Sequence, residues 1–341
     1  MPERVIDRVW ESSGLGARFA RGALIPASWA YAAAVAARNA AYDRGWLPSY
    51  ALALPAVAVG NLTVGGTGKT PVAAFIAARL SQLGMKPAIV MRGYGSDETR
   101  VHERLNPGIP VIVAADRVRG AEEARATGRS VVVLDDAFQH RRAKRDADIV
   151  LLAADRAGPV RSLPAGPWRE PLTSLRRASM LMVTRKSASA VRARELLAHA
   201  RLFAPQAVVA IAHLAADRLV NSLSGESLDI SAIRDKSVLA VAGIGDPFAF
   251  SSQLSDLGAR VELVARPDHH AYSAAEAGAL ARRASGADFV ICTLKDAVKL
   301  SALWPREAHP LWYLSQRVVV ESGAAELDAM LTTLAVAKPT N

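Results

Sequence analysis

Between residues 55 and 152, short stretches that are continuously apolar alternate with longer stretches of mixed polarity. Continuous apolar runs are typical of strands buried on both faces, and the stretches between them have the length of helices. This pattern predicts strands at 55–59, 87–91, 109–114, 130–134 and 147–152, with helices at 71–83 and 117–127. Strands that alternate with helices predict an α/β fold, with a mainly parallel sheet and helices on both faces.

The alternation continues, with a change of character in the middle of the chain. Further strands are predicted at 180–184 and 206–212, and residues 219–228 have the composition of a turn-rich ribbon. A second block predicts strands at 238–242, 260–264 and 289–293 and helices at 247–257 and 274–284. We therefore predict a larger domain at 48–212, a ribbon-like linker at 213–235 and a smaller α/β domain at 236–341. Loops at the carboxyl ends of the strands are expected to build an active site between the two domains.

The N-terminal segment contains an almost wholly apolar stretch, residues 23–37, interrupted by Pro26. It falls short of the ~20 residues that a membrane-spanning helix needs. The arginines that flank it are Arg18, Arg21, Arg38 and Arg44. Trp29 and Tyr31 are residue types that favour the membrane interface, and arginines suit anionic headgroups. We predict that residues 1–47 are a membrane-associating helical segment; a helix packed on the protein's own core is the alternative.

The amino-acid composition excludes some classes of protein but does not determine the function. The chain has 341 residues, 51% of them hydrophobic, which is enough for two domains with a sizeable core. Its single cysteine, Cys292, excludes an intrachain disulfide, and the apolar sequence around it predicts a buried position. The net charge of +10 indicates an anionic partner: nucleic acid, anionic lipid or a phosphorylated substrate. Basic residues are spread widely and aromatic residues are scattered, which argues against nucleic acid.

A glycine-rich loop follows the first predicted strand and opens the first predicted helix. In this setting, Gly-Gly-Thr-Gly-Lys-Thr is a phosphate-binding loop, or P-loop, whose backbone N–H groups close around phosphate oxygens. Lys69 is expected to reach the β- and γ-phosphates of ATP, and the Thr70 hydroxyl to bind Mg²⁺. The strict pattern has glycine where this chain has Thr63, so we expect Gly60 and Asn61 to form the first tight turn. The predicted nucleotide-binding residues are Gly65, Gly66, Thr67, Gly68, Lys69 and Thr70.

A second acidic element follows the strand predicted at 130–134. Val-Val-Val-Leu-Asp-Asp, residues 131–136, is typical of the acidic strand end that places a carboxylate beside the metal of a P-loop. We predict that at least one of Asp135 and Asp136 has a metal role, and the sequence leaves open which.

With both elements present, the sequence closely resembles the tetraacyldisaccharide 4′-kinases of lipid A synthesis. The matching segments are residues 59–71, 92–95, 134–142, 163–171, 242–247, 267–272 and 293–299. They occur in the family's order over nearly the whole chain. The most distinctive are Asp-Asp-Ala-Phe-Gln-His at 135–140 and Gly-Ile-Gly-Asp-Pro at 243–247.

The resemblance implies transfer of the γ-phosphoryl group of ATP, with Mg²⁺, to the 4′-hydroxyl of a lipid-linked glucosamine disaccharide 1-phosphate. It also implies a peripheral or monotopic location at the cytoplasmic face of the bacterial inner membrane. Neither nucleic acid nor an obligate protein partner is expected.

The resemblance assigns candidate roles to individual residues. Asp97 aligns with the family's catalytic aspartate and would accept or orient the hydroxyl proton, while His269, from the smaller domain, would hold or share that proton. The candidate metal ligands are Thr70, Asp135, Asp136 and Glu170. The candidate substrate or phosphate contacts are Asn61, Arg92, Arg117, Gln139, His140 and Arg169.

The sequence departs from the family in two places. Gly95 leads directly into Ser-Asp-Glu-Thr, where the family usually has a longer segment, so Asp116 is an alternative to Asp97 as the catalytic acid. The family's Thr-Glu-Lys-Asp is Thr-Leu-Lys-Asp here, with Leu294 in place of the glutamate.

A competing hypothesis is a P-loop NTPase that acts as a switch or motor without a lipid acceptor. Such a protein would hydrolyse a nucleotide with no phosphorylated product. The chain lacks the Asn-Lys-x-Asp sequence that specifies guanine, which argues against a GTPase.

Overall fold

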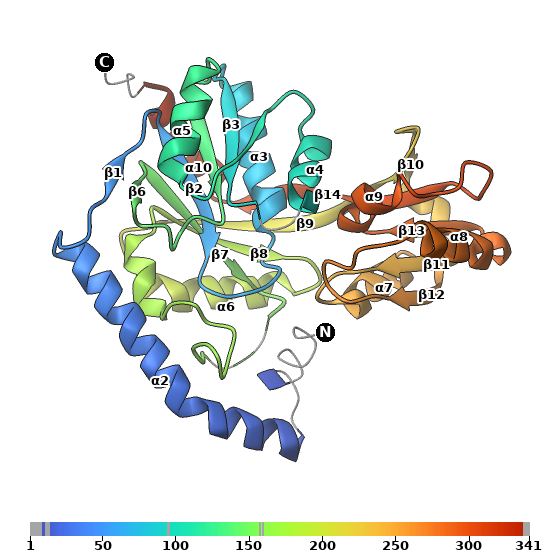
Figure 1. Cartoon of the computed structure of the whole chain (residues 1–341), viewed down its shortest axis with the longest axis horizontal. Helices are drawn as coiled ribbons and strands as arrows, with labels where there is room; N and C mark the ends of the chain where they lie inside the picture. The colour runs from blue at the N-terminus through green and yellow to red at the C-terminus, as the bar shows by residue number, and fades with distance from the viewer. Residues whose placement is uncertain (1–8, 11–13, 94–95, 157, 159, 337–341) are drawn as a thin grey trace. The chain divides into compact units, whose positions relative to one another are not determined.

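The computed structural model describes residues 9–10, 14–93, 96–156, 158 and 160–336 (Figure 1). Tyr94 and Gly95, which end the predicted Arg-Gly-Tyr-Gly segment, lie outside these ranges. The chain divides into two compact units. The larger unit contains residues 2–94, 102–214 and 318–341, and the smaller contains residues 95–101 and 215–317.

The larger unit is built on a parallel sheet. Its strands lie in the order β9-β8-β7-β2-β5-β3-β4, and every neighbouring pair is parallel. They are β2 (Ala56–Asn61), β3 (Pro87–Met91), β4 (Val111–Val113), β5 (Val131–Asp135), β7 (Ala147–Ala153), β8 (Met180–Arg185) and β9 (Val208–Asn221). All residues of β2, β3 and β5 are buried, as expected for a parallel sheet covered on both faces.

Helices cover both faces of this sheet (Figure 1). Helices α3 (Lys69–Gln82) and α10 (Ala324–Val336) pack on one face, against side chains such as Val57 and Val59. On the other face, α5 (Arg117–Ala126) packs against Ala56 and Ala58, and α6 (Ala190–Arg201) packs against β7 and β8. Successive β2 residues therefore enter different cores, because side chains alternate along a strand. The predicted fold class is confirmed.

The smaller unit repeats this architecture with fewer strands. Its order is β12-β11-β13-β14, again parallel, formed by β11 (Ser237–Ala242), β12 (Arg260–Ala265), β13 (Phe289–Cys292) and β14 (Leu311–Ser322). Helices α8 (Ala274–Arg283) and α9 (Leu294–Leu300) pack on one face, and α7 (Pro247–Asp256) on the other. Cys292 is buried, as predicted. The predicted ribbon is also present, because β10 (Ser227–Asp229) pairs antiparallel with residues 218–220 of β9.

The sequence pattern missed several elements. These are α4 (Ser96–Leu105), α6, α9, β14 and α10, together with the short pieces β1 (Tyr50–Ala51), β6 (Ala143–Lys144), η1 (Leu172–Arg177), η2 (Ile230–Ile233) and η3 (Ala284–Gly286). Residues 318–341, predicted within the smaller domain, cluster with the larger unit, because α10 packs beside α3. The boundary between the units also falls within α4, after Val101.

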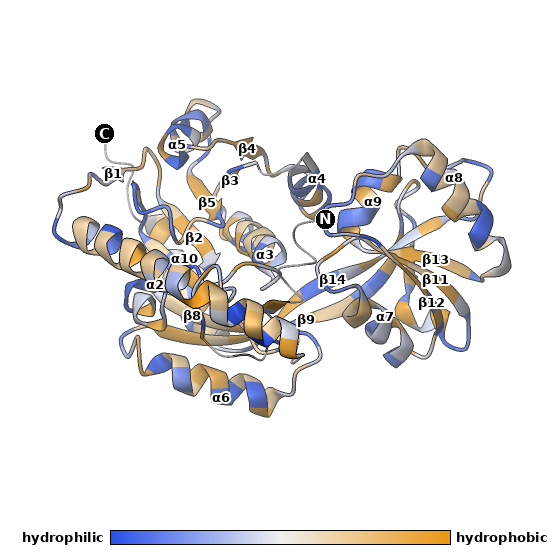
Figure 2. Ribbon diagram, turned by 60° about the horizontal axis from the view of Figure 1, so that its bottom comes forward, coloured by the Kyte–Doolittle hydropathy of each residue, from blue (hydrophilic) through white to orange (hydrophobic). Residues whose placement is uncertain are grey.

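The N-terminal apolar stretch lies within one long helix, α2 (Leu15–Asp43), which continues through Pro26 (Figure 2). Its two buried residues are the polar Ser28 and Asn39. The Ser28 hydroxyl donates to the Ser162 carbonyl (3.1 Å) and accepts from the Ala165 N–H (2.9 Å), which attaches the helix to the rest of the larger unit. No helix among the residues that the structure describes is long and apolar enough to cross a membrane.

Candidate active site

The P-loop joins the end of β2 to the start of α3. Gly65 and Gly68 have φ angles of 98° and 83°, in the left-handed region that favours glycine. A Cβ atom at Gly68 would lie 2.5 Å from the end of the Leu214 side chain, so a larger residue would have to displace Leu214 as well as adopt a left-handed φ. Because α3 begins at Lys69, both Lys69 and Thr70 lie at the helix N-terminus, where N–H groups and the helix dipole favour phosphate.

Asn61 holds this loop in place by hydrogen bonds of its side chain. Its amide nitrogen donates to the hydroxyls of Thr67 (2.8 Å) and Thr63 (3.3 Å), and its own carbonyl accepts from the Gln139 amide (2.9 Å). The expectation that Gly60 and Asn61 form the first turn is wrong, since both belong to β2. Gly60 is instead required by packing, because a Cβ there would lie 2.6 Å from the Phe138 Cβ atom.

Asp135 and Asp136 end β5 beside the loop but have different surroundings. The buried Asp135 carboxylate contacts His102 Nε2 through Oδ2 (2.9 Å), and its buried Oδ1 has no hydrogen-bond partner among the described residues. Asp136 is exposed, has a φ of 49°, and lies 3.9 Å from the Lys69 ammonium. A non-glycine residue in the left-handed region is uncommon, and such strain is concentrated at functional sites.

Arg169 joins two of the predicted site residues. Its guanidinium donates to both Asp136 carboxylate oxygens, at 2.9 and 3.2 Å, and to the Asn61 side-chain oxygen. The structure therefore brings together Asn61, Lys69, Asp136 and Arg169. The sequence suggested these four separately.

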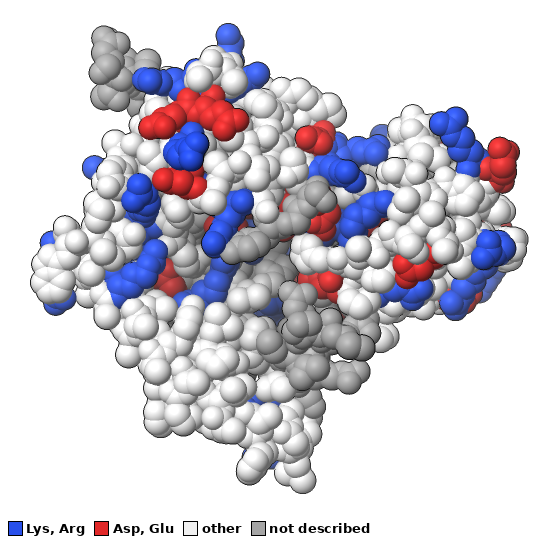
Figure 3. All heavy atoms as spheres, viewed as in Figure 1, with Lys and Arg blue, Asp and Glu red and all other residues white. Residues whose placement is uncertain are grey.

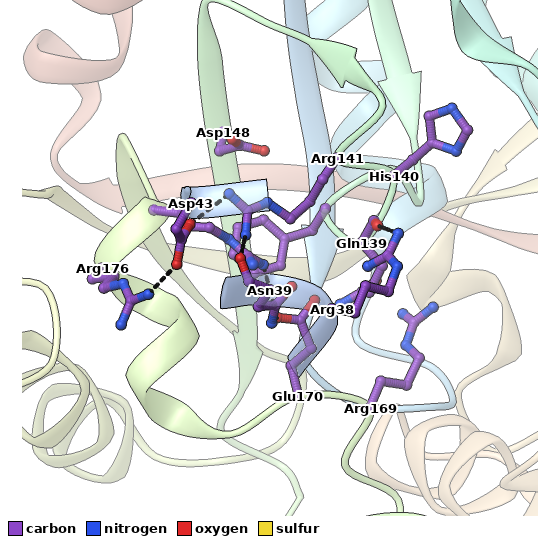
Figure 4. Close-up of polar contacts among 12 residues, drawn as sticks. Arg38, Asn39, Asp43, Gln139, His140, Arg141, Asp148, Arg169, Glu170 and Arg176 are labelled. Carbon is purple, nitrogen blue, oxygen red and sulfur yellow. Dashed lines mark hydrogen bonds and ion pairs between the residues drawn. The ribbon is translucent and has the colours of Figure 1, made fainter. Parts of the chain in front are cut away.

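Glu170 lies in a polar cluster that fixes α2 to the rest of the larger unit (Figure 4). Its Oε2 accepts from the Asn39 amide (2.8 Å) and from Arg177 (2.9 Å), while its buried Oε1 has no partner among the described residues. Arg141 adds hydrogen bonds to the Asn39 carbonyl (2.8 Å) and to Asp43 (2.7 Å). The hydrogen bonds of Glu170 with Asn39 and Arg177 help to hold α2 in place. Its role as a metal ligand stays a prediction.

The remaining candidates are held mainly by backbone groups and helix ends. Arg117 is buried, and its guanidinium donates to the carbonyls of Ala114 (3.0 Å) and Asp135 (3.2 Å). Asp116 caps α5 by accepting from the Val118 N–H (3.1 Å), which gives this alternative catalytic acid a structural task. The Nε2 atom of His140 lies 3.9 Å from Oδ1 of Asp116. The last candidate, Arg92, is exposed just after β3.

Asp97 and His269 form a hydrogen-bonded pair in the smaller unit. Asp97 lies in the first turn of α4, where the helix dipole stabilises a carboxylate, and His269 follows β12. His269 Nδ1 and Asp97 Oδ2 are 3.0 Å apart, and the φ of His269 is 54°. The sequence predicts that these residues come from different domains. Instead, both belong to one compact unit, so their hydrogen bond forms within it.

The charges around this pair favour an ion pair. Burial alone raises the pKa of Asp97, but the hydrogen bond and charge of His269, together with Lys299 and Lys295, lower it to about 2. The hydrogen bond to Asp97 in turn raises the pKa of His269. The neighbouring His270 contacts Glu276 (3.0 Å), the residue that completes the capping box of α8. His270 therefore supports the loop that carries His269.

Sequence reasoning also missed His102 and Lys299, which both contact candidate site residues. His102 is fully buried in α4 and contacts Asp135, and the Lys299 ammonium lies 3.9 Å from Asp97 Oδ2. A signal for the first existed, because Ser-Asp-Glu at 96–98 is typical of a helix start. No sequence pattern links Lys299 to Asp97, since their contact depends on the folding of distant segments.

A parallel α/β sheet with a P-loop at the N-terminus of α3, and an acidic strand end beside it, defines a P-loop nucleotide-binding protein. The family profile described as tetraacyldisaccharide-1-P 4′-kinase matches residues 20–108 and 96–335 of the chain. The chain belongs to the tetraacyldisaccharide-1-P 4′-kinase family.

Individual relatives agree with this assignment. The tetraacyldisaccharide 4′-kinase of Anaeromyxobacter dehalogenans (strain 2CP-1) is 38% identical over 325 residues, which cover 86% of each chain. That of Halorhodospira halophila is 37% identical, over 95% of this chain and 96% of the relative. The solved structure of LpxK from Aquifex aeolicus in complex with ATP matches with a TM-score of 0.72 and 27% identity, covering 92% of this chain and 99% of that one.

Proposed function

We propose that the chain transfers the γ-phosphoryl group of ATP to the 4′-hydroxyl of a tetraacylated glucosamine disaccharide 1-phosphate. Family membership and the P-loop support this reaction. The observation that carries it beyond nucleotide hydrolysis is the hydrogen bond between His269 and the buried carboxylate of Asp97. A positioned pair of this kind suits the handling of an acceptor hydroxyl's proton, which a switch or motor without an acceptor does not transfer.

The residues beside the P-loop fit a Mg²⁺ ion. Thr70 follows Lys69 at the helix start, and Asp135 presents one buried carboxylate oxygen with no hydrogen-bond partner among the described residues. An unpaired buried acceptor is costly unless something binds it, and carboxylate oxygens are ligands that Mg²⁺ prefers. When bound, Mg²⁺ supplies positive charge that offsets the charge of the transferring phosphoryl group. Thr70 and Asp135 would hold the ion, and Asp136 would act through Lys69 and Arg169.

His102 is proposed to orient Asp135 for this metal. Replacing His102 with alanine removes the hydrogen bond to Oδ2, so the carboxylate can rotate away. We expect affinity for Mg²⁺ to fall by about 10- to 100-fold, as when outer-shell partners of other metal sites are removed. His102→Gln should retain most of the wild-type affinity for Mg²⁺, because the glutamine amide can also donate a hydrogen bond to Asp135.

The melting temperature is measured in the presence of ATP as the Mg²⁺ concentration is increased, and the Mg²⁺ concentration that gives half of the rise is compared between variants. This measurement does not require turnover. The exposed His199→Ala is the control for loss of a histidine. Unchanged Mg²⁺ dependence in His102→Ala would show that the His102 contact serves packing only.

Asp97 is proposed to orient the acceptor hydroxyl and accept its proton. The O4′–P bond forms as the bond from the γ-phosphorus to the β,γ-bridging oxygen breaks, and ADP leaves. A carboxylate with a pKa near 2 is a weak base, so its main task before transfer is to accept a hydrogen bond from the hydroxyl. Lys69 stabilises charge on the transferring group.

An acceptor-dependence assay tests this function. Purified protein with ATP and Mg²⁺ should release ADP rapidly only when the disaccharide 1-phosphate is present. ADP release at the same rate without acceptor would favour the switch or motor instead.

We further propose that α2 lies on the cytoplasmic face of the inner membrane. Leu15 and Phe19 are each 83% exposed and Trp29 is 71% exposed, which is unusual for large apolar side chains in water. Figure 3 shows a surface with few charged side chains in the lower part of the view, where Figure 1 draws the N-terminal half of α2. Such a helix suits an interfacial position better than a fully aqueous one.

Replacing Arg18 and Arg21 together with glutamine should weaken binding to anionic vesicles by about 30-fold at low salt. Each basic residue near an anionic surface contributes about 1 kcal/mol, and the effect is screened by salt. Co-sedimentation with phosphatidylglycerol vesicles measures it. Arg192→Gln with Arg194→Gln, on exposed positions of α6, makes the same change of charge and should have little effect. Equal binding by both double variants would exclude α2 as the anchor.

A further inference from the structure

Lys299 lies between two carboxylates in the smaller unit. Its ammonium is 3.9 Å from Asp97 Oδ2 and 3.7 Å from Asp296 Oδ1. The nitrogen is buried and has no hydrogen-bond partner among the described residues. An ammonium removed from water is costly unless opposite charges lie near it, and these two carboxylates are the acidic groups within 4 Å of it among the described residues.

Asp296 already has its own donors. It is fully buried and accepts from the Gly243 N–H (3.0 Å), the Thr293 hydroxyl (2.6 Å) and the Tyr272 hydroxyl (3.0 Å). These donors come from three segments that are distant in sequence: 242–247, 267–272 and 293–299. Asp296 therefore ties together the loop after β11, the loop that carries His269 and the start of α9.

This arrangement leaves Lys299 available to Asp97. Asp296 holds the ammonium from one side, the Tyr272 ring lies 5.6 Å away, and Asp97 faces it from α4. If Lys299 served Asp296 alone, it would be expected to form a hydrogen bond with it. Instead the ammonium lies at nearly equal distances from the two carboxylates, so its charge acts on both.

We propose that Lys299 is a positioning residue that acts through Asp97 and makes the Asp97–His269 pair a three-membered unit. The inference rests on the proposed phosphoryl transfer for its catalytic meaning. The buried ammonium stabilises the charged Asp97 carboxylate and fixes its direction, ready to accept a hydrogen bond from the acceptor hydroxyl. Because its nitrogen is shielded from solvent, Lys299 acts on Asp97 and not on the substrate.

The charged groups that face Asp97 are few. His269 approaches from the loop after β12, and Lys295 and Lys299 approach from α9. Lys295 lies 4.0 Å from Glu98, beside Asp97 in the same helix, and is more exposed than Lys299, at 32% against 14% of the side chain. Lys295 is thus the matched control: the same residue type, one turn earlier, paired mainly with another carboxylate.

The test is the pKa of Asp97 in the unliganded full-length protein, followed by the ¹³C signal of its carboxyl carbon, which Asp97→Asn assigns. Loss of an opposite charge at this distance raises a carboxyl pKa by about one to three units. We therefore expect the pKa to rise by about one unit or more in Lys299→Met and in the closer-sized Lys299→Gln. Lys299→Arg should keep it low, and Lys295→Met should move it less.

Turnover provides the second readout. In both neutral variants kcat should fall by about 10- to 100-fold, while the Kd for ATP stays within about twofold of the wild type, because Lys299 is not in the P-loop. An unchanged Asp97 pKa in the folded Lys299→Gln protein would overturn the proposal. So would a loss of kcat in Lys299→Arg equal to that in Lys299→Met. The pKa arm needs no substrate, so its outcome is distinct from any failure of the proposed reaction.

Discussion

Lys69→Ala should lower kcat by about 10²–10³-fold. Lys69 lies at the start of α3, and its ammonium is proposed to stabilise the charge that grows on the transferring phosphoryl group. Removal of one such preorganised charge typically costs about 2.7–4 kcal/mol. Thr70→Ala should lower activity by a similar factor, because it removes a hydroxyl proposed to bind Mg²⁺. Both are measured as steady-state turnover of ATP and the disaccharide 1-phosphate.

The exposed Lys144→Ala is the control for loss of a lysine and should be close to wild type. Activity within threefold of wild type in either P-loop variant would refute the assignment of the loop. A lower melting temperature alone would not account for the expected loss, because Lys69 is at a helix end and its removal leaves no core cavity.

The second large effect concerns Asp97 and His269. Each alanine substitution should lower kcat/KM by about 10²–10⁴-fold, the usual range for proton handling by a positioned side chain. Since the two side chains are hydrogen-bonded at 3.0 Å, they are expected to act as one unit. The double variant should then be little worse than the worse single variant, because groups that act together are strongly non-additive. ATP binding should survive in all three proteins.

Two outcomes would contradict this expectation. Multiplicative losses in the double variant would show that Asp97 and His269 act independently. A nearly normal Asp97→Ala enzyme would move the role to another acid, and Asp116→Ala would then be the variant to examine. The structure makes the latter result unexpected, because Asp116 already caps α5.

The fold was largely predictable because the strands of a parallel sheet are continuous apolar runs. Segments such as 87–91 have no competing pattern, and their limits agree with the structure. The elements that the pattern missed have weaker local signals. Among the side chains of helix α4 that the structure describes, Val101 alone is apolar and buried, so no apolar stripe marks the helix. Strand β14 begins buried and ends exposed, so neither strand pattern holds along its length.

The candidate site was predictable to the extent that it is local in sequence. The P-loop and the Asp135–Asp136 pair are contiguous motifs whose chemistry follows from their residue types. The pairing of Asp97 with His269 came from family resemblance, and no spacing rule gives it. Contacts that depend on tertiary structure, such as that of His102 with Asp135, could not be predicted from the sequence. The same holds for Asn39, whose contact with Glu170 joins segments 131 residues apart.

The central claim is tested most directly by the position of the phosphate that the enzyme adds. Purified protein is incubated with ATP, Mg²⁺ and the tetraacylated disaccharide 1-phosphate, and the lipid product is analysed by mass spectrometry and ³¹P–¹H NMR. We predict one added phosphate on the 4′ oxygen, with one ADP formed per product. ATP consumption that yields inorganic phosphate and leaves the disaccharide unchanged would contradict the assignment as a lipid kinase.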